Sequence, residues 1–436
     1  MCERAGDNGI PGSGNGNDQK GSLLEEARIA SEETAHKVRS GVRFHVDMEE
    51  GYDDNIYRTN DDMESDYITS VKPGISYDFT PAPIEGKTRT ISSLTLDLGG
   101  EIVRYAEHGN LNRDTLTKNI FSHFNMESVF FDRVNTYFSL ERKQRVAAEL
   151  YPEARTSPTS SSRDRLVDYW TNNYGANYNM GAGRYTLVLG YGHSDVIYES
   201  EEDKVNNNIH DTFSLSAYMD FMPDTQLFLT GSHTVASRPK SRNNDVEYDN
   251  FSAGITGKIA PKTNVTVSAG YTMVDAETGD DTDSIDASLS LEYQLFPRLT
   301  FNASASRSIQ DMAEQAETAT EDTDDRPDSE WATDITSQYA RVDRLFLGVS
   351  YFPSLDERLS LRAGVSYNRS EYDSGREDKT YRFDLGAGYQ LNEWLSLTGK
   401  YTFRKQISDI DDSGDPSDDQ GGYENNVYTL GLSAKF

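Results

Sequence analysis

The sequence lacks most of what a soluble core or a helical membrane domain requires. Cys2 is the only cysteine among 436 residues, so neither an intramolecular disulfide nor a thiolate metal cluster can form. No apolar run exceeds three residues, as in 345–347, whereas a membrane-spanning helix needs roughly 20. This absence excludes transmembrane helices and the continuous apolar strands of a parallel α/β sheet. Antiparallel β-structure in which each strand has one polar face remains.

Positive charge is also scarce, since 42 Lys and Arg residues face 73 Asp and Glu residues, a net charge of −31. Nearly all of the excess lies in five short segments, namely 49–66, 199–208, 275–283, 310–330 and 407–423. Such segments are expected to be loops, and acidic loops argue against a nucleic-acid partner. The acidic runs could supply oxygen ligands to a divalent cation, but none matches an EF-hand, so solvated and mutually repelling loops are the favoured interpretation.

No catalytic motif is present. The sequence contains no GxSxG, HExxH, GxxxxGK[ST] or GxGxxG pattern. His193, His210 and His233 are expected on neighbouring strands or at their ends, so a hydrolase at the barrel rim stays open as an alternative to histidines without a catalytic role. We predict that the protein is not an enzyme and has neither a cofactor nor a metal site.

From residue 39 onwards, apolar and polar residues alternate with a period of two. In 285–295, for example, Ile285, Ala287 and Leu289 alternate with Asp286 and Ser288. Each such segment has about ten residues or more, the length of a tilted strand that crosses a bilayer. The sequence predicts that residues 39–436 form an all-β, antiparallel transmembrane barrel, preceded by a flexible leader over 1–38 with a possible short helix within 22–38.

The connections between these segments alternate between short turns and long polar loops. We expect tight turns near residues 81, 132, 183, 223, 261, 297, 353 and 392, and long connections over 49–65, 107–115, 148–163, 199–208, 237–246, 275–283, 310–333, 370–378 and 407–423. These seventeen connections predict eighteen strands, with short periplasmic turns, acidic extracellular loops and both termini in the periplasm. The segment 116–147 alternates least clearly.

If the apolar face contacts lipid, a set of basic residues points into the lumen: Lys72, Lys258, Arg344, Arg362, Arg382, Lys400 and Arg404. Salt bridges that stiffen the wall are one interpretation, and a basic track that guides an anionic polymer is the other. The last strand carries Tyr428, Leu430, Leu432 and the terminal Phe436 on one face. A terminal aromatic on an alternating strand resembles the assembly signal of outer-membrane barrels, which implies the barrel-assembly machinery as a partner.

Residues 50–59 resemble the signature E-x-Y-[DN]-D-N-[IV]-[YF] of the putative β-barrel porin type 2 family, matched by Tyr52, Asp53, Asp54, Asn55, Ile56 and Tyr57. The resemblance implies an eighteen-stranded outer-membrane channel that exports an exopolysaccharide, with periplasmic export components as further partners. A general diffusion porin and an adhesive surface barrel are the alternatives. We expect a bacterial outer membrane, with its lipid and lipopolysaccharide, although residues 1–21 contain no apolar signal segment.

Overall fold

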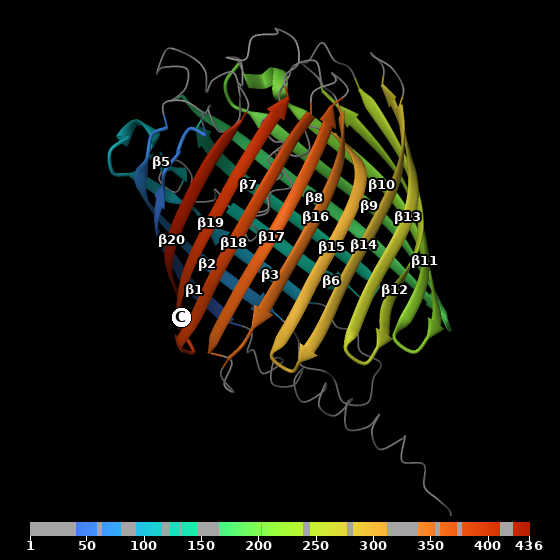
Figure 1. Ribbon diagram of the computed structural model, residues 1–436. Coiled ribbons are helices and arrows are strands. Elements are labelled where there is room, and N and C mark those ends of the chain that lie inside the picture. The colour runs from blue at the N-terminus through green and yellow to red at the C-terminus, as the bar shows by residue number, and fades with distance from the viewer. Residues whose placement is uncertain are drawn as a thin grey trace, which may run out of the picture.

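The computed structural model describes residues 41–58, 63–79, 93–115, 123–130, 133–146, 165–201, 203–238, 245–276, 282–311, 339–353, 358–372, 377–409 and 422–436. Eighteen long antiparallel strands form a closed wall, in which each strand pairs with the next and β20 pairs back with β1 (Figure 1). The predicted fold class and strand number are therefore confirmed. No helix in the ranges above is long and apolar enough to cross a membrane.

The wall strands are β1 (Gly41–Asp53), β2 (Asp66–Phe79), β3 (Ser93–Gly99), β6 (His123–Phe130), β7 (Val134–Val146), β8 (Leu166–Ala182), β9 (Tyr185–Tyr198), β10 (Asn208–Met222), β11 (Thr225–Ser237), β12 (Val246–Ala260), β13 (Thr263–Ala276), β14 (Thr282–Phe296), β15 (Leu299–Asp311), β16 (Tyr339–Tyr351), β17 (Leu359–Tyr372), β18 (Glu377–Asn392), β19 (Leu395–Asp409) and β20 (Tyr423–Lys435). Four short elements lie between them: β4 (Ile102–Tyr105), η1 (Gly109–Leu111), β5 (Arg113–Asp114) and η2 (Asp203–Asn206).

The alternating pattern fixes which face of the wall each side chain occupies. On β14, Ile285 is 71 % exposed and Leu289 is also exposed, while Asp286 and Ser288 lie on the opposite face. Large apolar side chains are exposed in the same way on most other strands, for example Phe251 and Leu430. In a barrel that spans a bilayer this outer face contacts lipid, and the alternate positions line the lumen.

At the end of the barrel that carries the C-terminus, hairpins join the strands through very short turns (Figure 1). Met222 pairs with Thr225 across Pro223 and Asp224, and the register shifts between Asp220 and Met222, which leaves a β-bulge. Equivalent shifts occur between Lys258 and Ala260, Gln294 and Phe296, and Gln390 and Asn392. A bulge interrupts the alternation, so two successive apolar residues, such as Phe221 and Met222, are both exposed at this rim.

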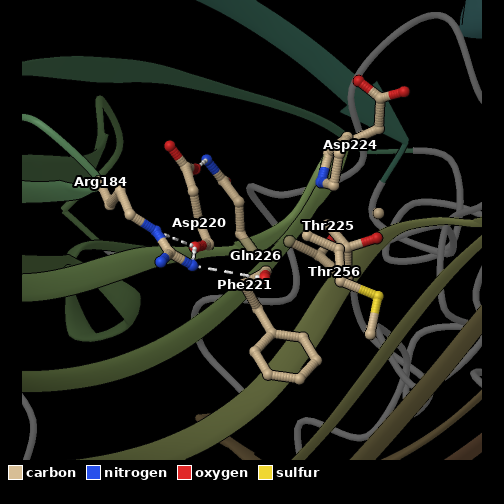
Figure 2. A pocket seen from close by; sticks show the side chains of 10 residues that line it. Arg184, Asp220, Phe221, Asp224, Thr225, Gln226 and Thr256 are labelled. Carbon is tan, nitrogen blue, oxygen red and sulfur yellow. Dashed lines mark hydrogen bonds between the residues drawn. The ribbon is translucent and has the colours of Figure 1, made fainter.

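Basic side chains from three of these turns hydrogen-bond to the backbone of a neighbouring strand or turn. Arg184, in the β8–β9 turn, donates from Nε and Nη2 to the carbonyl oxygen of Asp220, at 3.0 and 2.6 Å (Figure 2). Lys262 donates to the carbonyl of Leu295, and Arg298 to that of Pro353. Arg184 also lines a hollow of about 680 Å³ on this rim, beneath the β10–β11 turn.

The long polar connection predicted over 107–115 lies between the wall strands β3 and β6. That region contains η1 and β5, and β4 pairs with the upper half of β2 where the shorter β3 has ended. Other predictions lie outside the described residues, namely the leader 1–38 with its helix, the turns at residues 81 and 132, the connection 148–163, and most of the loop 310–333. The two strands expected within 116–147 are present as β6 and β7.

Candidate functional site

Five of the seven predicted lumen bases lie on four neighbouring strands, β16–β19, at three heights. Arg362 and Lys400 both align with Gly386, on the level nearest the short turns. Arg382 pairs directly with Arg404 four residues further along. Arg344 aligns with Asn368, two residues beyond that level. With a strand rise of about 3.3 Å per residue, the bases extend over roughly 20 Å of the lumen.

The environment of these five bases is not uniform. Arg382 donates from Nη2 to Asp384 at 3.0 Å, and Thr402 donates to the same carboxylate at 2.7 Å. Arg382 and Arg404 are buried, whereas Arg362 is exposed. Asp384 thus holds one arginine of this wall in position through a salt bridge, while Arg362 stays exposed.

The other two predicted bases lie elsewhere. Lys72, on β2, is 3.6 Å from the carboxylate of Glu101, in a part of the wall that also carries many acidic residues. Lys258, on β12, lies next to the short-turn rim, where its backbone N–H donates to the carbonyl of Asp224. The structure therefore does not gather all seven bases into one site.

The wall roughly half a circumference away, β8–β10, faces the basic arc mainly with hydroxyl and amide groups. Inward positions there include Asn173, Asn177, Ser194, Thr212 and Ser214. Strands β8–β11 contain no Lys or Arg. A solute in the lumen therefore meets cations on one side and uncharged hydrogen-bonding groups on the other.

Sequence reasoning missed an aromatic ring beside this basic arc. Phe346 faces inward on the same level as Arg382, because it is the middle residue of the apolar run 345–347 whose outer members face lipid. Its ring lies against the wall where Gly348 and Gly364 have no side chain, so close that a Cβ on Gly348 would meet the ring at 2.6 Å. The run of three apolar residues was the signal that could have identified it, since alternation requires one of them to point inward.

A second inward phenylalanine follows the same rule on the other side of the barrel. Phe228 is the middle residue of the run 227–229 and lies against Gly254 of the neighbouring strand. Its centroid is 6.2 Å from that of Tyr218. The lumen therefore presents aromatic faces as well as charges.

The residues of the family-like motif close the barrel at its loop end. Asp53 accepts a hydrogen bond from Asn425 Nδ2 at 2.6 Å, and Asp54 accepts two from Asn426, at 2.6 Å from the backbone N–H and 2.7 Å from the side chain. Asn55 donates from Nδ2 to the carbonyl of Glu424 at 2.9 Å. On the outer face, Tyr52 packs against Tyr67 and Tyr428. This cluster joins the first and last strands of the chain.

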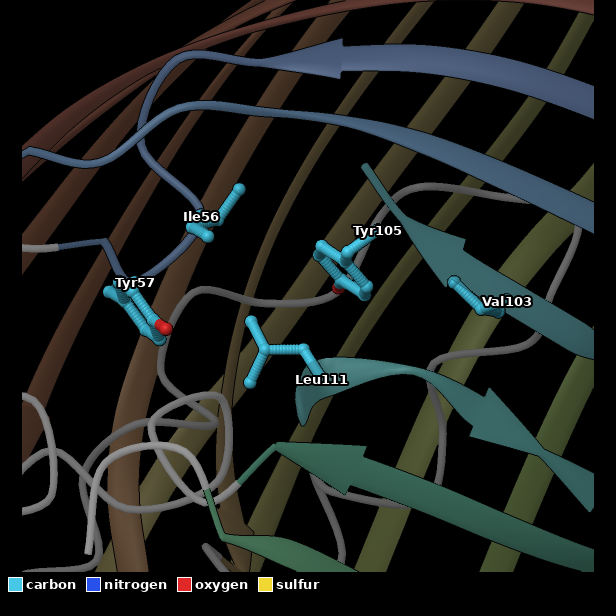
Figure 3. Packing of buried hydrophobic residues seen from close by; sticks show 5 residues of the cluster. All are labelled: Ile56, Tyr57, Val103, Tyr105 and Leu111. Atoms are coloured by element: carbon cyan, nitrogen blue, oxygen red, sulfur yellow. The ribbon is translucent and has the colours of Figure 1, made fainter. Parts of the chain in front are cut away.

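The end of the motif turns inward and forms a buried apolar cluster at the mouth of the barrel. Ile56 and Tyr57 pack with Val103, Tyr105 and Leu111, which come from β4 and η1 (Figure 3). These five are among the most buried apolar side chains of the described chain. The first loop is thereby fixed against the inner wall.

His108 adjoins this cluster and is held between two carboxylates. Its Nδ1 is 2.8 Å from Asp66 and its Nε2 is 2.7 Å from Glu64, while its ring contacts Tyr57 edge-on. Burial alone would lower the pKa of His108, but the hydrogen bonds to Asp66 and Glu64 outweigh burial and raise the pKa above its ordinary value. Both ring nitrogens then donate, as the imidazolium form requires.

The predicted assembly residues lie on the lipid face of β20. Phe436 is 66 % exposed and stacks on Trp394 with a centroid distance of 5.6 Å. Its backbone exchanges two hydrogen bonds with Phe44, at 2.8 and 3.1 Å. Tyr428, Leu430 and Leu432 share its face and are also exposed.

The three histidines of the hydrolase alternative do not meet. His193 contacts Asp211 on the outer face, His233 contacts Asp249 on the same face, and His210 is buried on the inner side beside Asn208. Within the described ranges, no group of three or more His, Cys, Asp or Glu residues is placed to hold a metal ion.

A family model described as "Outer membrane protein beta-barrel domain" matches residues 259–436. Together with this match to part of the chain, the closed eighteen-strand wall and its exposed apolar face are those of a bacterial outer-membrane β-barrel. No curated protein sequence matches the chain.

Among solved structures, the chain is similar to OpdK of Pseudomonas aeruginosa with vanillate, at 9 % identity and a TM-score of 0.48, covering 91 % of this chain and 99 % of that one. It is also similar to an anion-selective porin from Comamonas acidovorans, at 11 % identity and a TM-score of 0.39, with the same coverage. A third similar structure is OmpT, an outer-membrane protein of Vibrio cholerae, at 10 % identity and a TM-score of 0.36, covering 91 % and 97 %.

Proposed function

We propose that the barrel is a channel for hydrophilic solutes that carry negative charge, and that these solutes pass along the lumen side of β16–β19. The observation that carries the proposal is the arrangement of five bases on three successive levels, with uncharged hydrogen-bonding groups opposite. Fixed charge in a low-dielectric channel raises the local concentration of the oppositely charged solute. Arg362, Lys400 and Arg344 are accessible from the lumen, while the buried Arg382 and Arg404 between them add to the positive field of this wall.

A secreted acidic exopolysaccharide is the specific cargo that we infer. Phe346 supports a sugar, because a ring lying flat on the wall offers an apolar face next to Arg382. The resemblance of 50–57 to barrels that accompany exopolysaccharide systems supports the same cargo. A general diffusion porin shares the charged wall but needs neither a polymer nor its export components.

The test replaces three lumen bases at once, Arg344→Gln, Arg362→Gln and Lys400→Gln, and measures the zero-current potential in planar bilayers under a salt gradient. The anion-to-cation permeability ratio should fall several-fold, because the anion loses its fixed counter-charges. The matched control removes the same charge from the outer face, with Arg307→Gln, Arg369→Gln and Lys379→Gln, and should leave the ratio unchanged. Equal ratios in the wild type and the lumen variant would contradict the proposed track.

The cargo is tested separately in cells. A strain without this protein should secrete much less acidic polysaccharide, and the wild-type gene should restore secretion where the lumen variant does not. If secretion continues at the normal level while the lumen variant still alters ion selectivity, the exopolysaccharide cargo is wrong and the diffusion porin becomes the better account.

A further inference from the structure

The outer face of β15–β18 carries a row of charges beyond its last apolar row. By strand register, Arg307 lies opposite Asp343, Asp343 opposite Arg369, and Arg369 opposite Lys379. Two residues towards the short turns on the same face, Leu345 and Tyr381 are exposed. The charged row therefore points outward and not into the lumen.

Contacts within the row hold its cations in place. Arg307 binds Asp343 with two hydrogen bonds, from Nε at 2.5 Å and from Nη2 at 2.7 Å. Arg369 donates to Glu377 at 2.9 Å and lies 3.8 Å from Asp343, and Lys379 lies 2.6 Å from Glu377. Arg307 uses only its Nε and Nη2 groups to bind Asp343, so other N–H groups of its guanidinium remain for another acceptor. Arg369 also lies 3.6 Å from Glu371, so the acids position all three bases and leave spare donors on Arg307.

The depth of the row places it among lipid headgroups. Directly on its membrane side, Tyr367 and Tyr381 face each other with ring centroids 5.1 Å apart. Aromatic residues form girdles at both interfaces of such barrels. Along each strand, the charged row lies two residues beyond this aromatic pair, towards the long loops. We therefore place it at the level of the headgroups of the outer leaflet.

The corresponding row on the other side of the barrel has the opposite charge. There His193 lies opposite Asp211, and beyond Val235 the row continues through Glu247 to Asp275. This row holds three acids and no Lys or Arg, and it also follows an aromatic row that includes Phe213. A general need for charge at this depth would not make the two sides differ in sign.

We propose that Arg307, Arg369 and Lys379 form a binding site for the phosphorylated headgroup of a glycolipid in the outer leaflet. A guanidinium group can bind two phosphate oxygens at once through two parallel hydrogen bonds, as Arg307 and Arg369 would. Lys379, at the end of the row, supplies a point charge. Exposed ion pairs contribute little to stability on their own, so the stability of the wall does not account for three bases in one row. Arg341, beside Glu371 in the next row, adds a fourth cation at the edge of the site.

The test measures binding of fluorescent lipid A to the detergent-purified full-length barrel, with diphosphorylated and enzymatically dephosphorylated lipid as the two probes. The variant carries Arg307→Gln, Arg369→Gln and Lys379→Gln. Its Kd for the diphosphorylated lipid should rise by about tenfold, with no change for the dephosphorylated lipid, because only charge-assisted hydrogen bonds to phosphate are lost.

Two controls keep this result interpretable. The lumen variant with Arg344→Gln, Arg362→Gln and Lys400→Gln loses the same charge from the inner face and should bind lipid A as the wild type does. A heat-dependent shift in gel mobility shows that each variant is folded. Unchanged affinity in the folded outer-face variant, or equal affinity of the wild type for both lipids, would overturn the site.

Discussion

Two arcs of the same wall differ sharply in charge. Strands β16–β19 carry nine Lys and Arg residues, whereas the six strands β8–β13 carry one, Lys258. Both arcs keep the same alternation and the same exposed apolar face. The bilayer requires an apolar outer face on every strand. It does not determine the charges on the outer face near the long loops, nor those that face the lumen. The bilayer therefore does not account for the difference in charge between the arcs.

The largest effect should come from reversing this difference in the lumen. With Arg344→Glu, Arg362→Glu and Lys400→Glu, we expect the anion-to-cation permeability ratio to fall by more than about tenfold, since repulsion replaces attraction. Adding Ser216→Arg, Ser232→Arg and Ser252→Arg on the cation-poor arc of the same variant should restore part of the ratio. Zero-current potentials measure both steps. If the added arginines do not restore the permeability ratio, the position of the cations on the wall matters as well as their number. The charge difference between the arcs would then not explain selectivity by itself.

A smaller effect is expected on the outer face of the cation-poor arc. Glu247 and Asp275 lie opposite each other and are exposed, so Glu247→Lys with Asp275→Lys places two cations at headgroup depth. Lipid A affinity should rise roughly threefold, less than the loss at the natural site, because an ammonium group cannot bind phosphate in the paired geometry of the guanidinium groups of Arg307 and Arg369. The isosteric pair Glu247→Gln and Asp275→Asn is the control, and it separates added attraction from relieved repulsion. A gain of equal size in both variants would mean that repulsion alone distinguishes the arcs.

The smallest effect concerns the two inward phenylalanines, one on each arc. Phe346→Ala should shorten the residence time of an acidic oligosaccharide in single-channel recordings by roughly threefold, through the loss of a stacking face. Phe228→Ala removes the same ring from the cation-poor arc and should change the residence time much less. Ion selectivity should be unaffected in both. Similar shortening by the two variants would show that aromatic contact, and not its combination with arginine, retains the sugar.

Much of this barrel could be predicted because one physical rule, the alternation of lipid-facing and lumen-facing residues, acts on every strand. It placed Arg362 and Lys400 on the inner face, and the strand number followed from the seventeen connections between the alternating segments. Which bases share a level could not be predicted, because pairing register depends on turn geometry and on bulges such as the one between Asp220 and Met222. The contacts of Asp54 with Asn426 could not be predicted either, since they join residues 372 positions apart.

The bulged hairpins with their basic caps have a mechanical consequence. A bulge frees a carbonyl from the ladder, and Lys262 fills that place at Leu295 with a side chain from the preceding turn. Arg184 and Arg298 reach across from one hairpin to the next in the same way. Side-chain hydrogen bonds thus link neighbouring hairpins along the short-turn rim. Widening the rim would break these hydrogen bonds in addition to ladder bonds, so we expect this end to resist widening and changes in conductance to arise nearer the long loops.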